Sequence, residues 1–180
     1  MAAHGRPPGI PHGLRAHPVG ARRPGRIVRG SRQGAGMADF CDFARLRMRW
    51  RPNRCLMLPP GFAAPAKAHE TSPVLAGSPS ALFGRLKAIV DEEPRIQWLA
   101  EDRAGYRLEL IQRSRIFRFP DRISVAVMPG AQSNSSAPAI YSRAQYGIWD
   151  FGVNRARVGR WARALETGRP APVARIGPIR

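Results

Sequence analysis

Residues 96–127 read IQWLAEDRAGYRLELIQRSRIFRFPDRISVAV, and the spacing of the apolar residues in this stretch decides the fold. Apolar and polar residues alternate with a period of two over 96–101, 106–119 and 122–127, which is typical of β-strands with one buried face. Turn-forming residues at 102–105 and at Pro120-Asp121 separate the three runs. The stretch therefore predicts three consecutive strands.

The apolar period changes to 3.6 on both sides of this stretch, which predicts two helices. On the N-terminal side, Ser78 or Ser80 can cap a helix, Pro79 suits its first turn and Pro94 ends it. The buried stripe of this helix comprises Leu82, Phe83, Leu86, Ile89 and Val90. Near the C-terminus, a second helix closes at Gly168. Its stripe comprises Val158, Trp161, Ala162 and Leu165.

The region between the third strand and the last helix completes the predicted sheet. Residues 128–138 are rich in Gly, Ser, Asn and Pro and predict a loop, and residues 139–144 predict one further short strand. All connections are too short for the crossover that a parallel pair needs, so the strands should be antiparallel. The fold class that follows is α+β, in the order α-β-β-β-β-α. We expect a two-layer sandwich, with an antiparallel sheet of about four strands and two helices on one face.

Charge is distributed unevenly along the chain, whose formal net charge is +18. Residues 1–36 contain seven Arg, eight Gly, five Pro and no acid, which predicts a disordered basic tail. Met37 is an alternative start that would leave this tail untranslated. Residues 78–167 predict the folded α+β domain, and residues 168–180 a disordered C-terminal tail. No window is apolar enough to span a membrane, and we expect a cytoplasmic location.

Residues 37–77 predict an extended arm and linker. Within the arm, residues 45–51 read RLRMRWR, so that Leu46, Met48 and Trp50 would share one face of an extended chain and four Arg the other. Three interpretations stay open. The apolar face packs on the domain, the arm binds anionic lipid or nucleic acid with Trp50 inserted or stacked, or the segment is disordered.

Cysteine and histidine are too sparse for the common zinc patterns. Cys41 and Cys55 form no CxxC motif, and His69 is the one His outside residues 1–36. A Cys–His nucleophile pair would need His69 beside one of these cysteines, all of them in Pro/Gly-rich surroundings, and is not expected. We therefore expect no catalytic residues, no metal and no cofactor.

The segment before the last helix, YSRAQYGIWDFGVNRAR at 141–157, carries the candidate site. In structural terms, Asp150 caps the helix, Gly147 supplies a turn with positive φ, and Asn154 faces the sheet with its hydrogen bonds satisfied. In functional terms, the same polar side chains converge at a helix N-terminus, where an anion can bind. The candidate ligand-binding residues are Arg143, Asp150, Asn154, Arg155 and Arg157.

Part of this segment, GIWDFGVNRAR at 147–157, resembles the C-terminal signature of a bacterial family known as domain of unknown function 1499. The resemblance also covers the helix at 80–93 with Pro94-Arg95, and the string FRFPD at 117–121. It extends more loosely to Pro52-Asn53, and spans most of residues 39–167 but none of residues 1–36. It implies no established reaction, cofactor or substrate. Trp149 stands where relatives tend to have Ser, which weakens a catalytic role for the segment.

Three function classes remain, in the order in which the sequence favours them. The first is a non-catalytic binding or interaction module that uses the 147–157 segment and the last helix to contact an anionic ligand or a protein partner. The second is an enzyme acting on an anionic or ester small molecule, for which Asp150 is the best available base. The third is a nucleic-acid or anionic-lipid binder that uses the basic arm.

Overall fold

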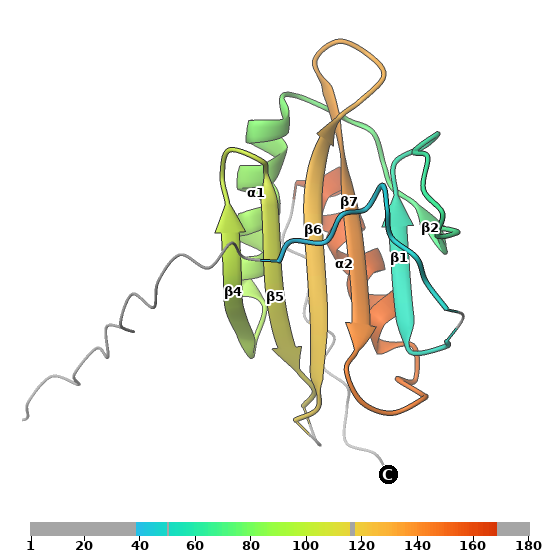
Figure 1. Ribbon diagram of the computed structural model, residues 1–180. Helices are drawn as coiled ribbons and strands as arrows, with labels where there is room; N and C mark the ends of the chain where they lie inside the picture. Colours follow the sequence, from blue (N-terminus) through green and yellow to red (C-terminus); the bar gives the residue numbers. More distant parts are fainter. Residues whose placement is uncertain (1–38, 50, 116–117, 169–180) are drawn as a thin grey trace, which may run out of the picture. The chain divides into compact units, whose positions relative to one another are not determined.

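The computed structural model describes residues 39–49, 51–115 and 118–168, and these form an α+β fold (Figure 1). Within these ranges, two helices and seven strands follow each other along the chain. They are β1 (Arg54–Leu58), β2 (Glu70–Thr71), β3 (Leu75–Ala76), α1 (Pro79–Glu92), β4 (Ile96–Asp102), β5 (Arg107–Arg113), β6 (Pro120–Pro129), β7 (Ser135–Ala144) and α2 (Val153–Thr167).

The strands form one open sheet in the order β2-β1-β7-β6-β5-β4, and β3 pairs with the start of β7. The strands β4 to β7 are antiparallel neighbours in chain order, as their short connections require. β1 pairs antiparallel with β7, placing Cys55 opposite Ser142, and β2 runs parallel to β1. The first described strand is therefore an inner strand of the sheet, held by the last one.

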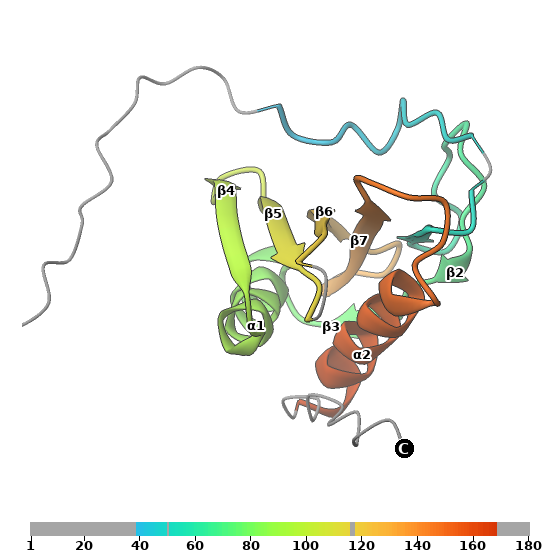
Figure 2. The same cartoon turned by 90° about the horizontal axis from the view of Figure 1, so that it is seen from below.

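Both helices cover the same face of the sheet (Figure 2). The helix α1 begins as predicted, because the Ser78 side chain accepts the N–H of Ala81 at 3.2 Å and Pro79 takes the first position. The helix α2 ends at Gly168, whose φ is +66°. Between helices and sheet lies the main core, which includes Leu86, Val90, Leu108, Leu110, Ile123, Ile140, Val158, Trp161 and Leu165.

The opposite face of the sheet is covered by residues 39–49, which run across it (Figures 1 and 2). Phe43 is buried there, and Leu46 and Met48 pack against a second apolar cluster, whereas the three Arg of 45–49 are exposed. The buried carboxylate of Glu109 accepts the N–H of Cys41 at 2.9 Å. This is the packed arm of the first interpretation, and Trp50 lies outside the described residues.

Three predictions about the sheet are corrected by the structure. It has seven strands instead of about four, because β1, β2 and β3 come from the segment predicted as arm and linker. The predicted loop at 128–138 is mostly strand, because β6 extends to Pro129 and β7 starts at Ser135. The run predicted over 106–119 ends as β5 at Arg113, and residues 116–117 lie outside the described ranges.

Candidate functional site

The loop between β7 and α2, residues 145–152, follows from two backbone requirements. Gly147, with φ at +79°, turns the chain out of β7, and Gly152, with φ at +77°, leads it into the helix. The Asp150 carboxylate accepts the N–H of Gly152 and the N–H of Asn154, each at 3.0 Å. It thereby satisfies donors that the first turn of α2 would leave free, as the sequence predicted for a cap.

Arg157 lies beneath α2 in a buried polar network. Its side chain is 3% exposed, and its Nη2 donates to Asp121 Oδ2 at 2.7 Å. Its Nη1 donates to Ser142 Oγ at 2.7 Å, and its Nε donates to Gln112 Oε1. Burial lowers the pKa of the Arg157 guanidinium, and the adjacent Asp121 carboxylate opposes that shift. Arg157 and Asp121 both lose their hydrating water on folding, and the direct bonds of the ion pair replace that water.

At one end of this network lies Glu93, the residue that follows α1. Its carboxylate accepts Arg160 Nη2 at 2.7 Å, Trp161 Nε1 at 2.8 Å and Gln112 Nε2 at 2.9 Å. Burial by itself would raise the pKa of Glu93, but these hydrogen bonds outweigh burial and hold the pKa below its usual value. Glu93 thus fixes the end of α1 to the inner face of α2.

At the other end of the network, Asn154 joins α2 to the loop and to β1. Its Oδ1 accepts Ser142 Oγ at 2.6 Å and Arg157 Nη1 at 2.8 Å. Its Nδ2 donates to Asp150 Oδ2 at 2.7 Å and to the carbonyl of Asn53 at 3.2 Å. All four hydrogen-bonding positions of this buried amide are therefore used. Asn53 completes the link, because its Nδ2 donates to the carbonyl of Gly147 at 2.7 Å.

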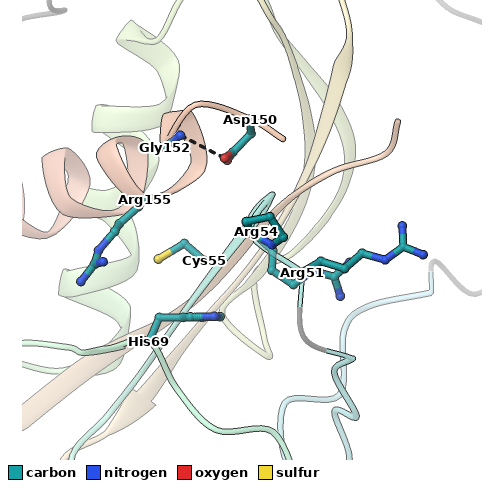
Figure 3. Close-up of a pocket in the computed structure, with 8 residues that line it drawn as sticks. Arg51, Arg54, Cys55, His69, Asp150, Gly152 and Arg155 are labelled. Atoms are coloured by element: carbon teal, nitrogen blue, oxygen red, sulfur yellow. Dashed lines mark hydrogen bonds between the residues drawn. The ribbon is translucent and has the colours of Figure 1, made fainter. Parts of the chain in front are cut away.

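A cavity of about 290 Å³ opens beside the loop. Its wall includes three arginines, Arg51, Arg54 and Arg155, together with Asp150 of the loop (Figure 3). Arg54 Nη1 donates to the carbonyl of Arg49 and to the hydroxyl of Tyr141, and Arg155 pairs with Glu70 at 2.6 Å. The Asp150 carboxylate is turned back towards Gly152 (Figure 3). Arg51 and Arg155 therefore bring positive charge to this cavity, whereas the Arg54 guanidinium lies on the side of the sheet that the arm covers.

Cys55 and His69 also line this cavity, as Figure 3 shows. Burial, and then the nearby Glu70 carboxylate, raise the pKa of the Cys55 thiol to about 11. A thiol with that pKa carries almost no thiolate near neutral pH, so it is a weak nucleophile. His69 Nδ1 accepts the N–H of Leu56 at 2.9 Å, and burial lowers the pKa of this imidazole. Cys55 is thus a side chain of the main core, and His69 is an acceptor for the backbone of β1.

The surface of the loop is unusually apolar. The large apolar side chains that are exposed in the described ranges number eight, and five of them lie between residues 146 and 153. These five are Tyr146, Ile148, Trp149, Phe151 and Val153. Phe151 is 95% exposed and Trp149 is 69% exposed. Exposed apolar side chains are thus concentrated on this loop, whereas single exposed apolar residues are normal on a folded domain.

The five residues predicted as ligand contacts fall in three places. Asp150 and Arg155 line the cavity. Asn154 and Arg157 are buried beneath α2 and bonded to protein groups. Arg143 alternates with Ser142 along β7, so it faces the side of the sheet that the arm covers, with its guanidinium 5.4 Å from the Tyr141 ring. Of the four residues predicted to converge at the start of the helix, Asp150 and Arg155 lie together at the cavity, whereas Asn154 and Arg143 lie elsewhere.

Sequence reasoning missed the apolar loop surface and most of the cavity wall. A usable signal was present in YGIWDF at 146–151, where four large apolar residues occur without helical or strand periodicity. No comparable signal pointed to Arg51 and Arg54, because pairing of β1 with β7 brings them to the loop. Within the described residues, no group of three His, Cys, Asp or Glu side chains could hold a metal ion, and neither helix could cross a membrane.

The chain was compared with known proteins and with protein-family models. A search of curated proteins finds no match to the chain. A family model, described as Protein of unknown function (DUF1499), matches residues 52–165. The match begins just before β1 and ends within α2, so it includes every described strand and both ends of the buried network. The resemblance seen in the sequence is thereby confirmed, and the chain belongs to the DUF1499 family.

Proposed function

We propose that this protein is a non-catalytic binding module whose contact surface is the loop at 145–152 with the start of α2. The observation that carries the proposal is the concentration of exposed apolar side chains on this one loop. Exposed Trp and Tyr side chains are the residue types most often found at contact surfaces. An exposed apolar surface that makes no contact lowers the solubility of a protein and contributes nothing to its stability.

The backbone of the loop supports this proposal independently. Phe151 has φ at +53°, in the left-handed region that a large side chain rarely adopts. A residue such as Gly or Asn would suit this position better, and would also suit its exposure to water. Phe151 is therefore unfavourable for the free protein in two respects. An unfavourable side chain at a loop tip is expected where that side chain makes a contact with another molecule.

The buried network supports a contact role as well, because it fixes the loop from beneath. Asn154 binds Asp150, and Asn53 binds the carbonyl of Gly147, so both halves of the loop are tied to the sheet. A loop held in this way loses little conformational entropy when it binds. In this proposal, Asp150, Asn154 and Arg157 position the contact surface, and Arg155 contributes to its charged rim.

An experiment on the full chain can test whether the loop is a contact surface. A photo-activatable phenylalanine analogue is placed at position 151, and, as a matched control, at position 99. Leu99 is 44% exposed on the edge strand β4, remote in the sheet from β7. In cells that make the protein, we expect adducts of defined size, to protein or to lipid, from position 151 and none from position 99. Equal labelling at the two positions would refute the proposal.

A further inference from the structure

We infer that the partner of this loop is the surface of an anionic lipid bilayer. The aromatic side chains of the loop enter the interfacial layer, while Arg51 and Arg155 bind the phosphate groups of lipids. This inference rests on the proposed function and names its partner. It differs from lipid binding by the arm alone, because the apolar insertion comes from residues 146–151.

The composition of the loop fits a bilayer interface. Trp and Tyr favour this interface because their rings are apolar at one end and polar at the other, and Phe and Ile contribute apolar burial. The one charged residue of the loop, Asp150, has its carboxylate bonded to two backbone N–H groups and to Asn154. The loop can therefore enter an apolar layer without bringing an unpaired charge into it.

The arginines around the loop fit an anionic headgroup. Arg51 and Arg155 line the cavity that Asp150 and Gly152 also border, so their charges lie next to the base of the loop. Arginine binds phosphate oxygens in pairs and holds its charge at any relevant pH. The net charge of the whole chain, +18, adds a general attraction to anionic membranes.

The size of the apolar surface favours a bilayer over a protein partner. A stable protein interface buries about 800 Å² on each side and uses about 20–30 residues of each partner. The apolar surface here is one loop with four large side chains between Tyr146 and Phe151, and a cationic cavity lies beside it. Interfacial binding needs no facing pocket, and a few aromatic side chains with neighbouring basic residues suffice for it.

Vesicle binding by the full chain tests this inference. The vesicles are phosphatidylcholine mixed with phosphatidylglycerol, and pure phosphatidylcholine, each also prepared with brominated acyl chains that quench tryptophan. We expect the wild type to bind the anionic vesicles and to show quenching. In Trp149→Phe most of the quenching should be lost while binding remains, and Trp50→Phe should quench as the wild type does. Quenching that survives Trp149→Phe but disappears in Trp50→Phe would assign insertion to the arm and overturn the inference.

Matched variants separate insertion from attraction by the basic tails, which all variants share. Phe151→Asn should weaken binding to anionic vesicles by about tenfold or more, since a buried Phe side chain accounts for at least that factor. Its control, Leu99→Asn, should bind as the wild type does. The basic tails keep part of the preference for anionic vesicles in every variant. The double variant Arg51→Gln/Arg155→Gln should reduce this preference, whereas exposed Arg103→Gln should leave it unchanged.

The two proposals fail in different ways. Suppose that Phe151→Asn binds vesicles as tightly as Leu99→Asn while position 151 still forms protein adducts. In that case the bilayer is the wrong partner, and the loop remains a contact surface. Absence of both vesicle binding through the loop and adducts at position 151 would remove both proposals.

Discussion

The first turns of α2 and the loop that precedes them differ in an unexpected way: the helix buries polar side chains, and the loop exposes apolar ones. Under α2, Arg157, Asn154 and Asp121 are buried, and direct hydrogen bonds satisfy them. On the loop, Trp149 and Phe151 are exposed to solvent. Polar groups are therefore inside and apolar groups outside within a single stretch of chain from residue 149 to residue 157.

The two regions serve different purposes, and the difference explains their compositions. A buried network of direct hydrogen bonds favours one geometry, because a displacement leaves polar groups unpaired at a high cost. The exposed loop contributes nothing to the core and gains free energy only in contact with something else. If this comparison is right, changes below α2 should affect stability strongly, and changes on the loop should affect binding with little loss of stability.

The largest expected effect is that of Arg157→Met. This change leaves the Asp121 carboxylate buried without its partner, and we expect unfolding free energy to fall by about 3–5 kcal/mol. The control Arg163→Met, on the exposed side of the same helix, should change it by less than about 0.5 kcal/mol. Urea denaturation followed by circular dichroism measures both. Equal stability of the two variants would show that the network does not hold α2.

A smaller loss is expected for Asn154→Ala. The change removes four hydrogen bonds of a buried amide, including those to Ser142 Oγ and to the Asn53 carbonyl, which we expect to cost about 2–3 kcal/mol. Since Asn154 also binds Asp150, the loop should become mobile. Hydrogen exchange measured by NMR should then show faster exchange at residues 146–152 than in β4. Unchanged protection of the loop would contradict its attachment through Asn154.

Glu93→Gln should change how stability depends on pH. The folded-state pKa of Glu93 is lowered, so its charge stabilises the fold above the unfolded pKa of about 4.5, and this contribution is lost as pH falls through the folded pKa. The variant should be less stable than the wild type at neutral pH by about 1.5 kcal/mol. The difference should shrink below pH 4.5. The control Glu92→Gln, an exposed neighbour, should show parallel curves to wild type in thermal unfolding between acidic and neutral pH.

The smallest effect on stability, and one of opposite sign, is expected for Phe151→Asn. Asn tolerates the left-handed backbone of this position better than Phe does, and no buried contact is lost. We expect a gain of about 0.5 kcal/mol in unfolding free energy, measured by thermal unfolding. A clear destabilisation would mean that Phe151 packs against the fold after all. Such a result would remove the contrast between the two regions.

The helices and the strands β4 to β7 could be predicted because apolar residues recur along them with a regular period. The stripe of Val158, Trp161 and Leu165 and the alternate residues Leu108 and Leu110 of β5 mark the sides that face the main core, although the arm buries the polar side of β5 as well. The strand β1 shows no such periodicity. Its residues Cys55, Leu56, Met57 and Leu58 are all buried, with helices on one side and the arm on the other. The Pro-Pro-Gly sequence that follows β1 is typical of linkers, so the sequence predicted a linker in this region instead of a strand.

The prediction of a loop at 128–138 was wrong for a related reason. Residues 135–139 are small, and their Ser and Pro content is typical of loops, yet all of them are buried in β7. Pro138 is accommodated because it lies between the stretch of β7 that pairs with β3 and the stretch that pairs with β1. The composition of this segment predicts a loop. It forms a strand because the arm and the helices pack on both faces of the sheet at this position.

The candidate site was predictable only in its local part. The cap by Asp150, the turn at Gly147 and the inward direction of Asn154 follow from spacing along one segment. The partners of Arg157 and Asn154 come from Asp121, Gln112 and Asn53, which are distant in sequence. No periodicity encodes such contacts, because they depend on which strands become neighbours.

The position of β1 has a consequence for the newly made chain. Ribosomes release β1 before any other described strand, but its antiparallel neighbour β7 is the last to emerge. Until β7 emerges, Leu56 and Met57 remain exposed, and the unpaired backbone of the incomplete sheet can bind other polypeptides. A translation product that stops short of Ser135 is thus expected to aggregate or to be degraded, and chaperones that shield early apolar segments should raise the yield of the finished protein.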